Sequence, residues 1–411
     1  MSYRVLHVLS QRPGLTGSGV ALNAITDAAQ ARGWIQSAVV GTPDTDPTPP
    51  VGPLSPADIH PLLFPSETCQ FALPGMSDVM PYRSSVFSTL SDDEIETYCA
   101  AWRQYMMHVI DRIAPDVIHS HHVWLLSSML KDLAPDTPVV THCHATGLRQ
   151  LELCPHLAER VRRGCQRNDH FVVLHAGHAD SLTEQLGVEK SRISIVGSGF
   201  APDIFHTDGR PVDCGHTVAY AGKLSRSKGF PWLLDAIDRV RERLPDVHLH
   251  VAGSGAGPEA DAVRDRMRSM PCVTYHGQLD QSGLAALLRT SAVFVLPSFY
   301  EGLPLVLVEA AACGCRLVST ELPGVVSQLS GPLQGRLECV PLPRLKSIDE
   351  PQEADLPGFV ERLAESVEHA LSRPLPEVRE DSLRDLAWEG VFDRVEPVWL
   401  DLRSLWEKKY S

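Results

Sequence analysis

The sequence predicts an α/β protein with two domains, each a doubly wound parallel sheet covered by helices. At 411 residues the chain is too long for one ordinary core and fits two domains of similar size. Short apolar runs alternate with amphipathic helical patterns, as parallel strands joined by crossover helices require. The runs are almost continuously apolar, which is typical of strands buried on both faces. Two such domains imply a cleft where a ligand can bind.

Six strand-like runs define the first domain. They cover residues 5–9, 38–40, 117–119, 139–142, 171–174 and 193–196. After the second run, residues 42–82 hold ten prolines and little periodicity. Because proline breaks helices and central strands alike, we expect this segment to be a long excursion from the first sheet. Loops of that length in enzymes are often functional.

A second series of strand-like runs begins after about residue 212 and predicts the second domain. It covers residues 218–221, 247–252, 273–276, 293–296 and 316–319. Residues 341–357 are rich in proline and acid, and we expect a surface loop there. The segment 383–406 returns to an amphipathic helix with its large side chains near one stripe: Trp388, Phe392, Val395, Trp399, Leu402 and Trp406.

Composition excludes several classes of protein. The formal net charge is −14, so the chain lacks the broad basic surface that nucleic acid binding requires. No run of about 18 apolar residues is present to span a bilayer, and no apolar signal core precedes Arg4. The ten cysteines form no CxxC framework and indicate buried thiols in a reducing compartment. We therefore expect a cytoplasmic protein that does not bind nucleic acid.

The most informative segment is residues 296–309, whose pattern predicts strand, loop and helix. Glu301 lies in the loop and Glu309 inside the helix. A helix start reached through a glycine presents unpaired N–H groups and a positive dipole end, which suits a diphosphate. A carboxylate inside that helix can accept hydrogen bonds from two ribose hydroxyls. We expect the diphosphate to lie against the helix start, formed by Gly302, Leu303, Pro304, Leu305 and Val306.

The alternative is that Glu309 caps a buried network and that Glu301 is a solvated loop charge. An acid within the otherwise apolar run 303–312 would cost about several kcal/mol to bury unpaired. A ligand role is therefore favoured.

Two lysines follow the predicted strand at residues 218–221. Gly222 and Lys223 begin the turn, and Lys228 lies near its end. Cations at the carboxyl end of a parallel strand lie where open α/β sheets bind ligands, and a departing diphosphate needs that charge. The alternative is a pair of solvated surface lysines. The acidic motif described above favours the ligand role.

A glycine loop follows the first strand and leads into a helix. It contains Thr16, Gly17, Ser18 and Gly19, which could let the backbone approach a phosphate or a sugar. The dinucleotide pattern GxGxxG fails because Leu22 stands where its third glycine belongs. We therefore expect no NAD site.

Histidines gather at three predicted strand ends: His119, His121 and His122, then His142 and His144, then His175 and His178. One interpretation is a zinc site, because HxH pairs at strand ends serve zinc hydrolases. The other is neutral histidines in the core or cleft that donate hydrogen bonds to substrate hydroxyls. No acid series completes a ligand set, so we expect no metal.

Together these segments resemble family 4 of the retaining glycosyltransferases, which has the GT-B fold and binds UDP-, GDP- or ADP-sugars. The resemblance covers nearly the whole chain. Glu301 and Glu309 match the family's motif of two glutamates separated by seven residues. Lys223 and Lys228 stand at the family's paired Arg and Lys. Lys223 keeps the charge of the arginine but loses its bidentate fork.

The resemblance extends to several loops. Gly253 lies in a segment similar to the family's glycine loop in the nucleotide domain, and Gly277 and Gln278 lie in one similar to its base-contacting turn. The loop at residues 16–19 stands at the family's double-glycine loop. His144 stands at the strand-end histidine that contacts the donor sugar.

Two further segments resemble the family's connections between domains. Residues 199–205 resemble the hinge, with Ala201 where an aspartate usually stands, and Trp388 begins a segment similar to the last helix, which crosses back to the first domain. The resemblance therefore implies an acceptor domain at residues 1–200 and a donor domain at 201–382. Helix 383–411 would pack on the acceptor domain.

The mechanism implied by the resemblance is front-side displacement with retention, without a protein nucleophile, cofactor or metal. Lys223 and Lys228 would stabilise the leaving diphosphate. Glu309 would hold the ribose, while Glu301 and His144 would hold hydroxyls of a hexose-type sugar from a UDP- or GDP-sugar.

The acceptor is expected to be a soluble small molecule or natural product. The predicted helix at 91–113 begins with acids, which oppose attraction to an anionic membrane. Three alternatives remain open: a synthase with the same donor site, a catalytically silent GT-B binding protein, and a zinc hydrolase using the histidines. The oligomeric state is also open, and a homo-oligomer is possible.

Overall fold

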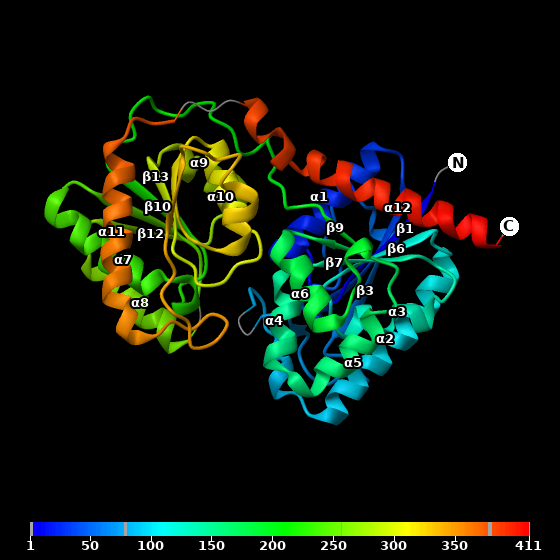
Figure 1. The fold of residues 1–411 in the computed structure, drawn as a ribbon. Helices are drawn as coiled ribbons and strands as arrows, with labels where there is room; N and C mark the ends of the chain where they lie inside the picture. Colours follow the sequence, from blue (N-terminus) through cyan, green and yellow to red (C-terminus); the bar gives the residue numbers. More distant parts are fainter. Residues whose placement is uncertain (1–2, 78–79, 256, 377–379, 411) are drawn as a thin grey trace. The chain divides into compact units, whose positions relative to one another are not determined.

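The computed structural model describes residues 3–77, 80–255, 257–376 and 380–410. The chain forms two compact units: residues 1–198 with 388–411 make the first, and residues 199–387 make the second. Each unit contains a large parallel β-sheet with helices on its faces (Figure 1). The predicted fold class of two doubly wound parallel-sheet domains is confirmed.

The first unit is built on a seven-stranded sheet in the order β3-β2-β1-β6-β7-β8-β9, with parallel neighbours throughout. Its strands are β1 (Arg4–Leu9), β2 (Ile35–Pro43), β3 (Ile59–Phe64), β6 (Val117–His121), β7 (Val139–Cys143), β8 (His170–Val173) and β9 (Ile193–Ile195). The strand order reverses at β1, which lies between β2 and β6. The carboxyl ends of β1 and β6 are therefore a topological switch point.

Helices cover both faces of this sheet. They are α1 (Gly17–Ala31), α2 (Asp92–Ile113), α3 (Leu125–Leu133), α4 (Ala145–Leu153), α5 (Pro155–Cys165), α6 (Ala176–Leu186) and α12 (Trp388–Tyr410). On one face, α1 and α12 bury Ile25, Phe392 and Trp399 against the strands. On the other, α2, α3, α5 and α6 enclose the larger core. The C-terminal helix thus belongs to the N-terminal unit.

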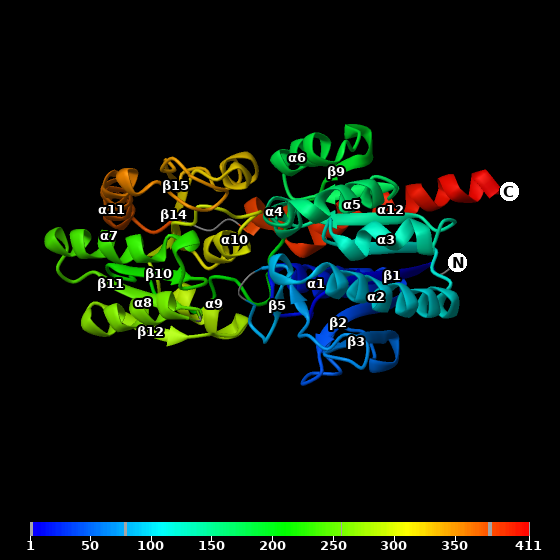
Figure 2. The ribbon, with the colours of Figure 1, turned by 90° about the horizontal axis from the view of Figure 1, so that it is seen from below.

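The proline-rich segment at residues 42–82 contains a strand that the sequence did not predict. β3 pairs with β2 at the outer edge of the sheet (Figure 2). Pro61 lies inside β3, and an edge strand tolerates a residue without an N–H. A two-residue strand, β4 (Pro74–Gly75), pairs with β5 (Ser85–Val86). The expectation that residues 42–82 leave the first sheet was wrong for β3, whereas β4 and β5 form a small sheet of their own. Residues 78–79 lie outside the described residues.

The second unit contains a six-stranded sheet in the order β12-β11-β10-β13-β14-β15. Its strands are β10 (Thr217–Ala221), β11 (His248–Ala252), β12 (Val273–Gly277), β13 (Val293–Leu296), β14 (Arg316–Thr320) and β15 (Leu337–Val340). Its helices are α7 (Phe230–Arg243), α8 (Pro258–Ser269), α9 (Gln281–Arg289), α10 (Leu305–Ala312) and α11 (Leu356–Ser372). Both views show α7 and α11 side by side over one face (Figure 2). The switch point of this sheet lies at the carboxyl ends of β10 and β13.

Cysteine placement agrees with the sequence: all ten are free thiols, and nine of them are buried. Among the described residues, no helix combines the length and apolar character needed to cross a membrane.

Candidate functional site

The two predicted motifs of the second unit meet at its switch point. Lys223 and Lys228 follow β10, and Glu301 follows the neighbouring strand β13. A short 3-10 turn, Arg226–Lys228, precedes α7. The backbone N–H of Phe299 donates to the carbonyl oxygen of Ser227 over 3.0 Å, which ties the two loops together. Parallel pairing of β10 with β13 thus brings sequence motifs about 75 residues apart to one edge of the sheet.

Lys228 and Glu301 form an ion pair at this edge. Nζ of Lys228 lies 2.7 Å from Oε1 of Glu301, and the side chains are 23% and 19% exposed. The hydroxyl of Ser298 donates to the same carboxylate oxygen over 2.8 Å. The carboxylate therefore has fixed donors on one oxygen, in a position that solvent or a ligand can reach.

Glu309 lies inside α10 and is only 7% exposed. Among the described residues, no hydrogen bond or ion pair to its carboxylate is found. Burial raises the pKa of Glu309 from 4.5 to about 7. An unpaired buried carboxylate is costly, which marks Glu309 as a candidate for contact with a ligand.

The residues before Glu309 adopt the predicted loop and helix start. Helix α10 begins at Leu305, and Pro304 is its N-cap. Leu303 and Pro304 are buried, whereas Gly302, Leu305 and Val306 are partly exposed. The helix start is thus accessible at three of the five positions that we expected to line a diphosphate.

The turn after β10 is held by buried contacts. The hydroxyl of Tyr220 donates to the carbonyl oxygen of Lys223 over 2.6 Å. Burial, followed by the nearby charge of Glu301, raises the pKa of Tyr220 well above its usual value. Tyr220 therefore remains a neutral donor that fixes the backbone of Lys223.

Three candidate glycines lie where the loops after β10, β11 and β12 cross. The N–H of Gly222 donates to Ala252 over 3.0 Å, and the N–H of Gly253 donates to the carbonyl of Gly277 over 2.7 Å. Gly253 has φ +139°, and a Cβ there would overlap the carbonyl oxygen of Gly222. Glycine at 253 is thus required by backbone packing, while Gln278 beside this crossing is exposed.

In the first unit, the candidate glycine loop forms the start of α1. Thr16 is the N-cap, and its side chain accepts from the N–H of Gly19 over 3.3 Å. Ser18 is buried, accepts from Nε2 of Gln11 over 2.7 Å and lies 3.1 Å from Nε2 of His122. A Cβ on Gly19 would overlap the backbone of Gly14, whereas Gly17 faces open space. Among these three, Gly17 has room for a ligand.

The predicted histidines lie in or just after β6 and β7 and just beyond β8, and His121, His142 and His144 are buried. Nδ1 of His121 lies 3.0 Å from Nε2 of His144, and their rings stack. Burial lowers the pKa of His142 to about 3, and burial followed by the charges of neighbouring histidines lowers that of His144 well below 6.5. These imidazoles are therefore neutral, as expected for hydrogen-bonding histidines.

Sequence reasoning missed the residues that orient the candidates. Ser298 holds Glu301, and Tyr220 holds the turn at Lys223. Both lie inside the motifs that were singled out, but a hydroxyl near a strand end carries no sequence signal of its own. Their roles emerge only once the strands are paired.

Models of two glycosyltransferase families match this chain. The model described as "Glycosyl transferase 4-like domain" matches residues 16–199, and the one described as "Glycosyl transferases group 1" matches residues 215–336. The chain belongs to the group 1 glycosyltransferases. This confirms the resemblance found in the sequence.

Relatives of this chain include a glycogen synthase of Mycobacterium tuberculosis, 30% identical over 51% of this chain. The chain spans about half (53%) of that relative's length. A D-inositol 3-phosphate glycosyltransferase of Corynebacterium aurimucosum is 25% identical over 78% of this chain and 80% of the relative. Among solved structures, the catalytic domain of starch synthase IV from Arabidopsis thaliana, bound to ADP and acarbose, has a TM-score of 0.66 and 13% identity, covering 98% of this chain and all of that one. It shares the GT-B fold.

Proposed function

We propose that this protein is a retaining glycosyltransferase that moves a hexose-type sugar from a UDP- or GDP-sugar to a soluble small-molecule or natural-product acceptor. The observation that carries the proposal is Glu309, a buried carboxylate without a hydrogen-bonding partner among the described residues. Two ribose hydroxyls of a nucleotide would supply the donors that it lacks.

The charges at the switch point suit departure of a nucleoside diphosphate. As the bond from the sugar carbon to the diphosphate oxygen breaks, the acceptor oxygen bonds to that carbon on the same face, and its proton passes to the departing phosphate. Lys228 and Lys223 would stabilise the negative charge that develops, a task that a metal ion performs in other enzymes. Glu301 would hold a hydroxyl of the donor sugar.

The solved starch synthase structure contains bound ADP, which supports a nucleotide-sugar donor. Two relatives have inositol in their names, a D-inositol 3-phosphate glycosyltransferase and a phosphatidyl-myo-inositol mannosyltransferase. Helix α2 adds to the argument because Asp92, Asp93 and Glu94 occupy its first turn. Those acids oppose binding to an anionic membrane, so the proposal includes a soluble acceptor and a cytoplasmic location.

A panel of UDP-, GDP- and ADP-sugars tested by thermal shift examines the donor. A ligand at about 100 times its Kd adds about 2.7 kcal/mol to stability. We expect a UDP- or GDP-sugar to raise Tm, and Glu309→Ala to abolish the rise. Asp265→Ala, which changes an exposed acid in the same unit, is the control and should keep it. A panel without any shift would contradict the proposal, as would an unchanged shift in Glu309→Ala.

Turnover separates this function from its two rivals. A silent GT-B binding protein would bind the donor but release no free sugar or diphosphate from it. A zinc hydrolase would lose activity in EDTA and regain it with Zn²⁺. We expect slow donor hydrolysis that gives the retained anomer, and transfer that persists in EDTA.

A further inference from the structure

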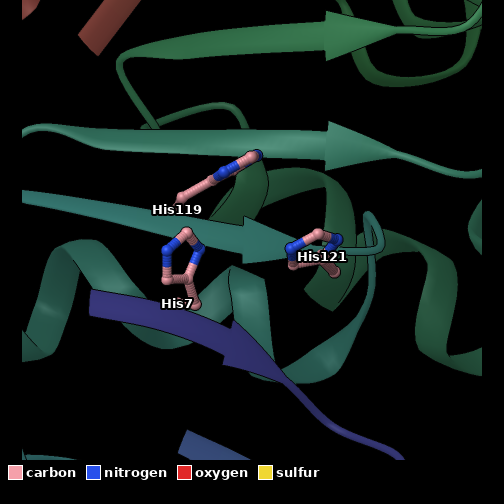
Figure 3. A group of neighbouring side chains, drawn as sticks. All are labelled: His7, His119 and His121. Atoms are coloured by element: carbon pink, nitrogen blue, oxygen red, sulfur yellow. The ribbon is translucent and has the colours of Figure 1, made fainter. Parts of the chain in front are cut away.

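The first unit contains a second group of chemically unusual side chains, on the face of the sheet beneath α12. His7 of β1 lies in register with His119 of β6, and His121 is two residues further along the same strand. All three imidazoles therefore project from one face. Figure 3 shows His7 directed toward His119, with His121 near the end of β6.

These histidines are buried, but several of their polar atoms lack hydrogen-bond partners. The three residues are at most 2% exposed. Within the part of the chain that the structure describes, Nδ1 of His7, both ring nitrogens of His119 and Nε2 of His121 make no hydrogen bond. Buried polar atoms normally have partners, so three such residues in one place call for an explanation.

We propose that His7, His119 and His121 bind one Zn²⁺ ion within the first unit. A ring nitrogen of each lies within 4.8 Å of those of the other two. Tetrahedral zinc with Zn–N distances of about 2.1 Å needs nitrogens about 3.4 Å apart, so binding requires the three rings to move closer together. Three imidazoles leave the fourth position for water or hydroxide. The site replaces, for these residues, our expectation that the histidines bind no metal.

The surroundings of His7 resemble the support that metal ligands receive in proteins. Its Nε2 lies 3.1 Å from Oε1 of Gln36, and because that oxygen can only accept, Nε2 carries the proton. The tautomer so fixed leaves the lone pair on Nδ1, the nitrogen without a partner. Trp399 of α12 packs its ring edge-on against His7 and His119 and shields them from solvent.

The site connects to the proposed transfer site through one hydrogen bond. If Nε2 of His121 binds the ion, its Nδ1 carries the proton and donates to Nε2 of His144, 3.0 Å away. His144 then keeps its own proton on Nδ1, where it can donate to a sugar hydroxyl. This consequence rests on the proposed function, but metal binding itself does not.

Metal analysis of tag-free protein, grown with added zinc and washed briefly with EDTA, tests the proposal. We expect about one Zn²⁺ per chain. The zinc content of His119→Gln should be about one tenth of that of the unmutated protein, or less. His178→Gln is the control, because His178 is also buried in the first unit but lies outside both groups of histidines whose ring nitrogens are close enough to share an ion: His7, His119 and His121, and His121, His142 and His144. It should retain the metal.

A titration of the unmutated protein with Co²⁺ keeps the test decisive if a variant fails to fold. We expect saturable visible absorption of the intensity typical of four-coordinate cobalt, at one ion per chain. Protein without zinc and without that absorption would overturn the site, and so would loss of zinc from His178→Gln equal to that from His119→Gln. Failure here would leave the donor-binding experiment unaffected.

Discussion

Burial of Glu309 makes the stability of the free protein depend on pH. Its pKa is raised to about 7 in the folded protein, against 4.5 for an unperturbed glutamate. The protonated form is therefore favoured by folding. That contribution is fully present below about pH 4.5 and is lost as pH rises through about 7, a difference on the order of 3 kcal/mol.

Glu309→Gln should consequently stabilise the free protein increasingly as pH rises. We expect its Tm to be close to that of the unmutated protein near pH 4.5 and higher by several degrees at pH 8, because the amide never ionises. The same variant should bind the donor more weakly, since an amide accepts fewer hydroxyl hydrogen bonds than a carboxylate. Thermal melts from pH 4.5 to 8, with and without donor, measure both. A Tm difference independent of pH would contradict the burial argument.

Lys228 should affect the rate of transfer more than binding of the donor. We expect Lys228→Ala to lower kcat about 100-fold, because the charge acts on the departing diphosphate. Lys228→Arg, which preserves the charge, should recover much of the rate. Steady-state kinetics and donor affinity check this pair of variants. An equal loss of kcat in Lys228→Ala and Lys228→Arg would indicate that the rate depends on the geometry of the ion pair with Glu301 and not on the charge alone.

At this scale, residue types were predictable but their environments were not. The acid and lysine motifs made Glu301, Glu309 and Lys228 candidates, because charged groups at apolar strand-helix junctions are costly to bury unpaired. The hydrogen bond from Ser298 could not be predicted, since it depends on the rotamer of a loop side chain. The face shared by His7 and His119 required the register of two strands far apart in sequence.

At the scale of elements, Gly253 joins the loops of three neighbouring strands. Gly253→Ala should destabilise the second unit by about 2–4 kcal/mol, because the added Cβ overlaps the carbonyl of Gly222 and φ is positive. Gly331→Ala is the control: no atom lies within 4 Å of its added Cβ, and it should be near neutral. Denaturant unfolding measures both variants. An unchanged free energy of unfolding in Gly253→Ala would mean that the loops after β10 and β11 move apart readily.

We expect the segment at residues 42–82, except for its strand β3, to determine which acceptor the protein uses. Exchanging residues 44–58 and 66–73 for those of a relative, while leaving the edge strand in place, should alter acceptor preference and leave donor affinity unchanged. Replacing the entire segment would also remove β3, and a loss of stability could then not be separated from a change in acceptor specificity. A competition assay with mixed acceptors reads the outcome, and an unchanged preference would argue against the role.

In the two large sheets, the strands missed by sequence reasoning are the edge strands β3 and β15; the two-residue strands β4 and β5 of the small sheet were missed as well. β3 contains a proline, and β15 (Leu337–Val340) is only partly buried at its first three residues. Neither shows the continuous apolar run that marked the central strands, because an edge strand has one neighbour and less surface to bury. All strands buried between two neighbours were found.

For the whole molecule, the C-terminal helix α12 stabilises the first unit, to which the chain returns after the second. Trp399 is fully buried there, and Trp399→Ala should cost about 3–5 kcal/mol. Leu405→Ala on the same helix is the control, since that side chain is 62% exposed. Hydrogen exchange should show the loss in unit 1 peptides and leave those of residues 199–387 protected. Equal loss in both units would show that they unfold together.

The two-unit organisation was predictable because length and two series of strands are properties of the entire sequence. Membership of the last helix in the first unit was inferred only from the family resemblance. Its apolar stripe indicates that it packs, but periodicity does not identify the surface on which it packs.

This path of the chain also sets an order of events during synthesis on the ribosome. Residues 199–387 have all their strands before α12 is translated, so the second unit can complete its core first. The first unit, although translated earlier, must wait with the α12 side of its sheet uncovered, including His7 and His119. A premature stop codon after residue 387 would therefore destabilise the first unit, at the beginning of the protein, and leave the second unit able to fold.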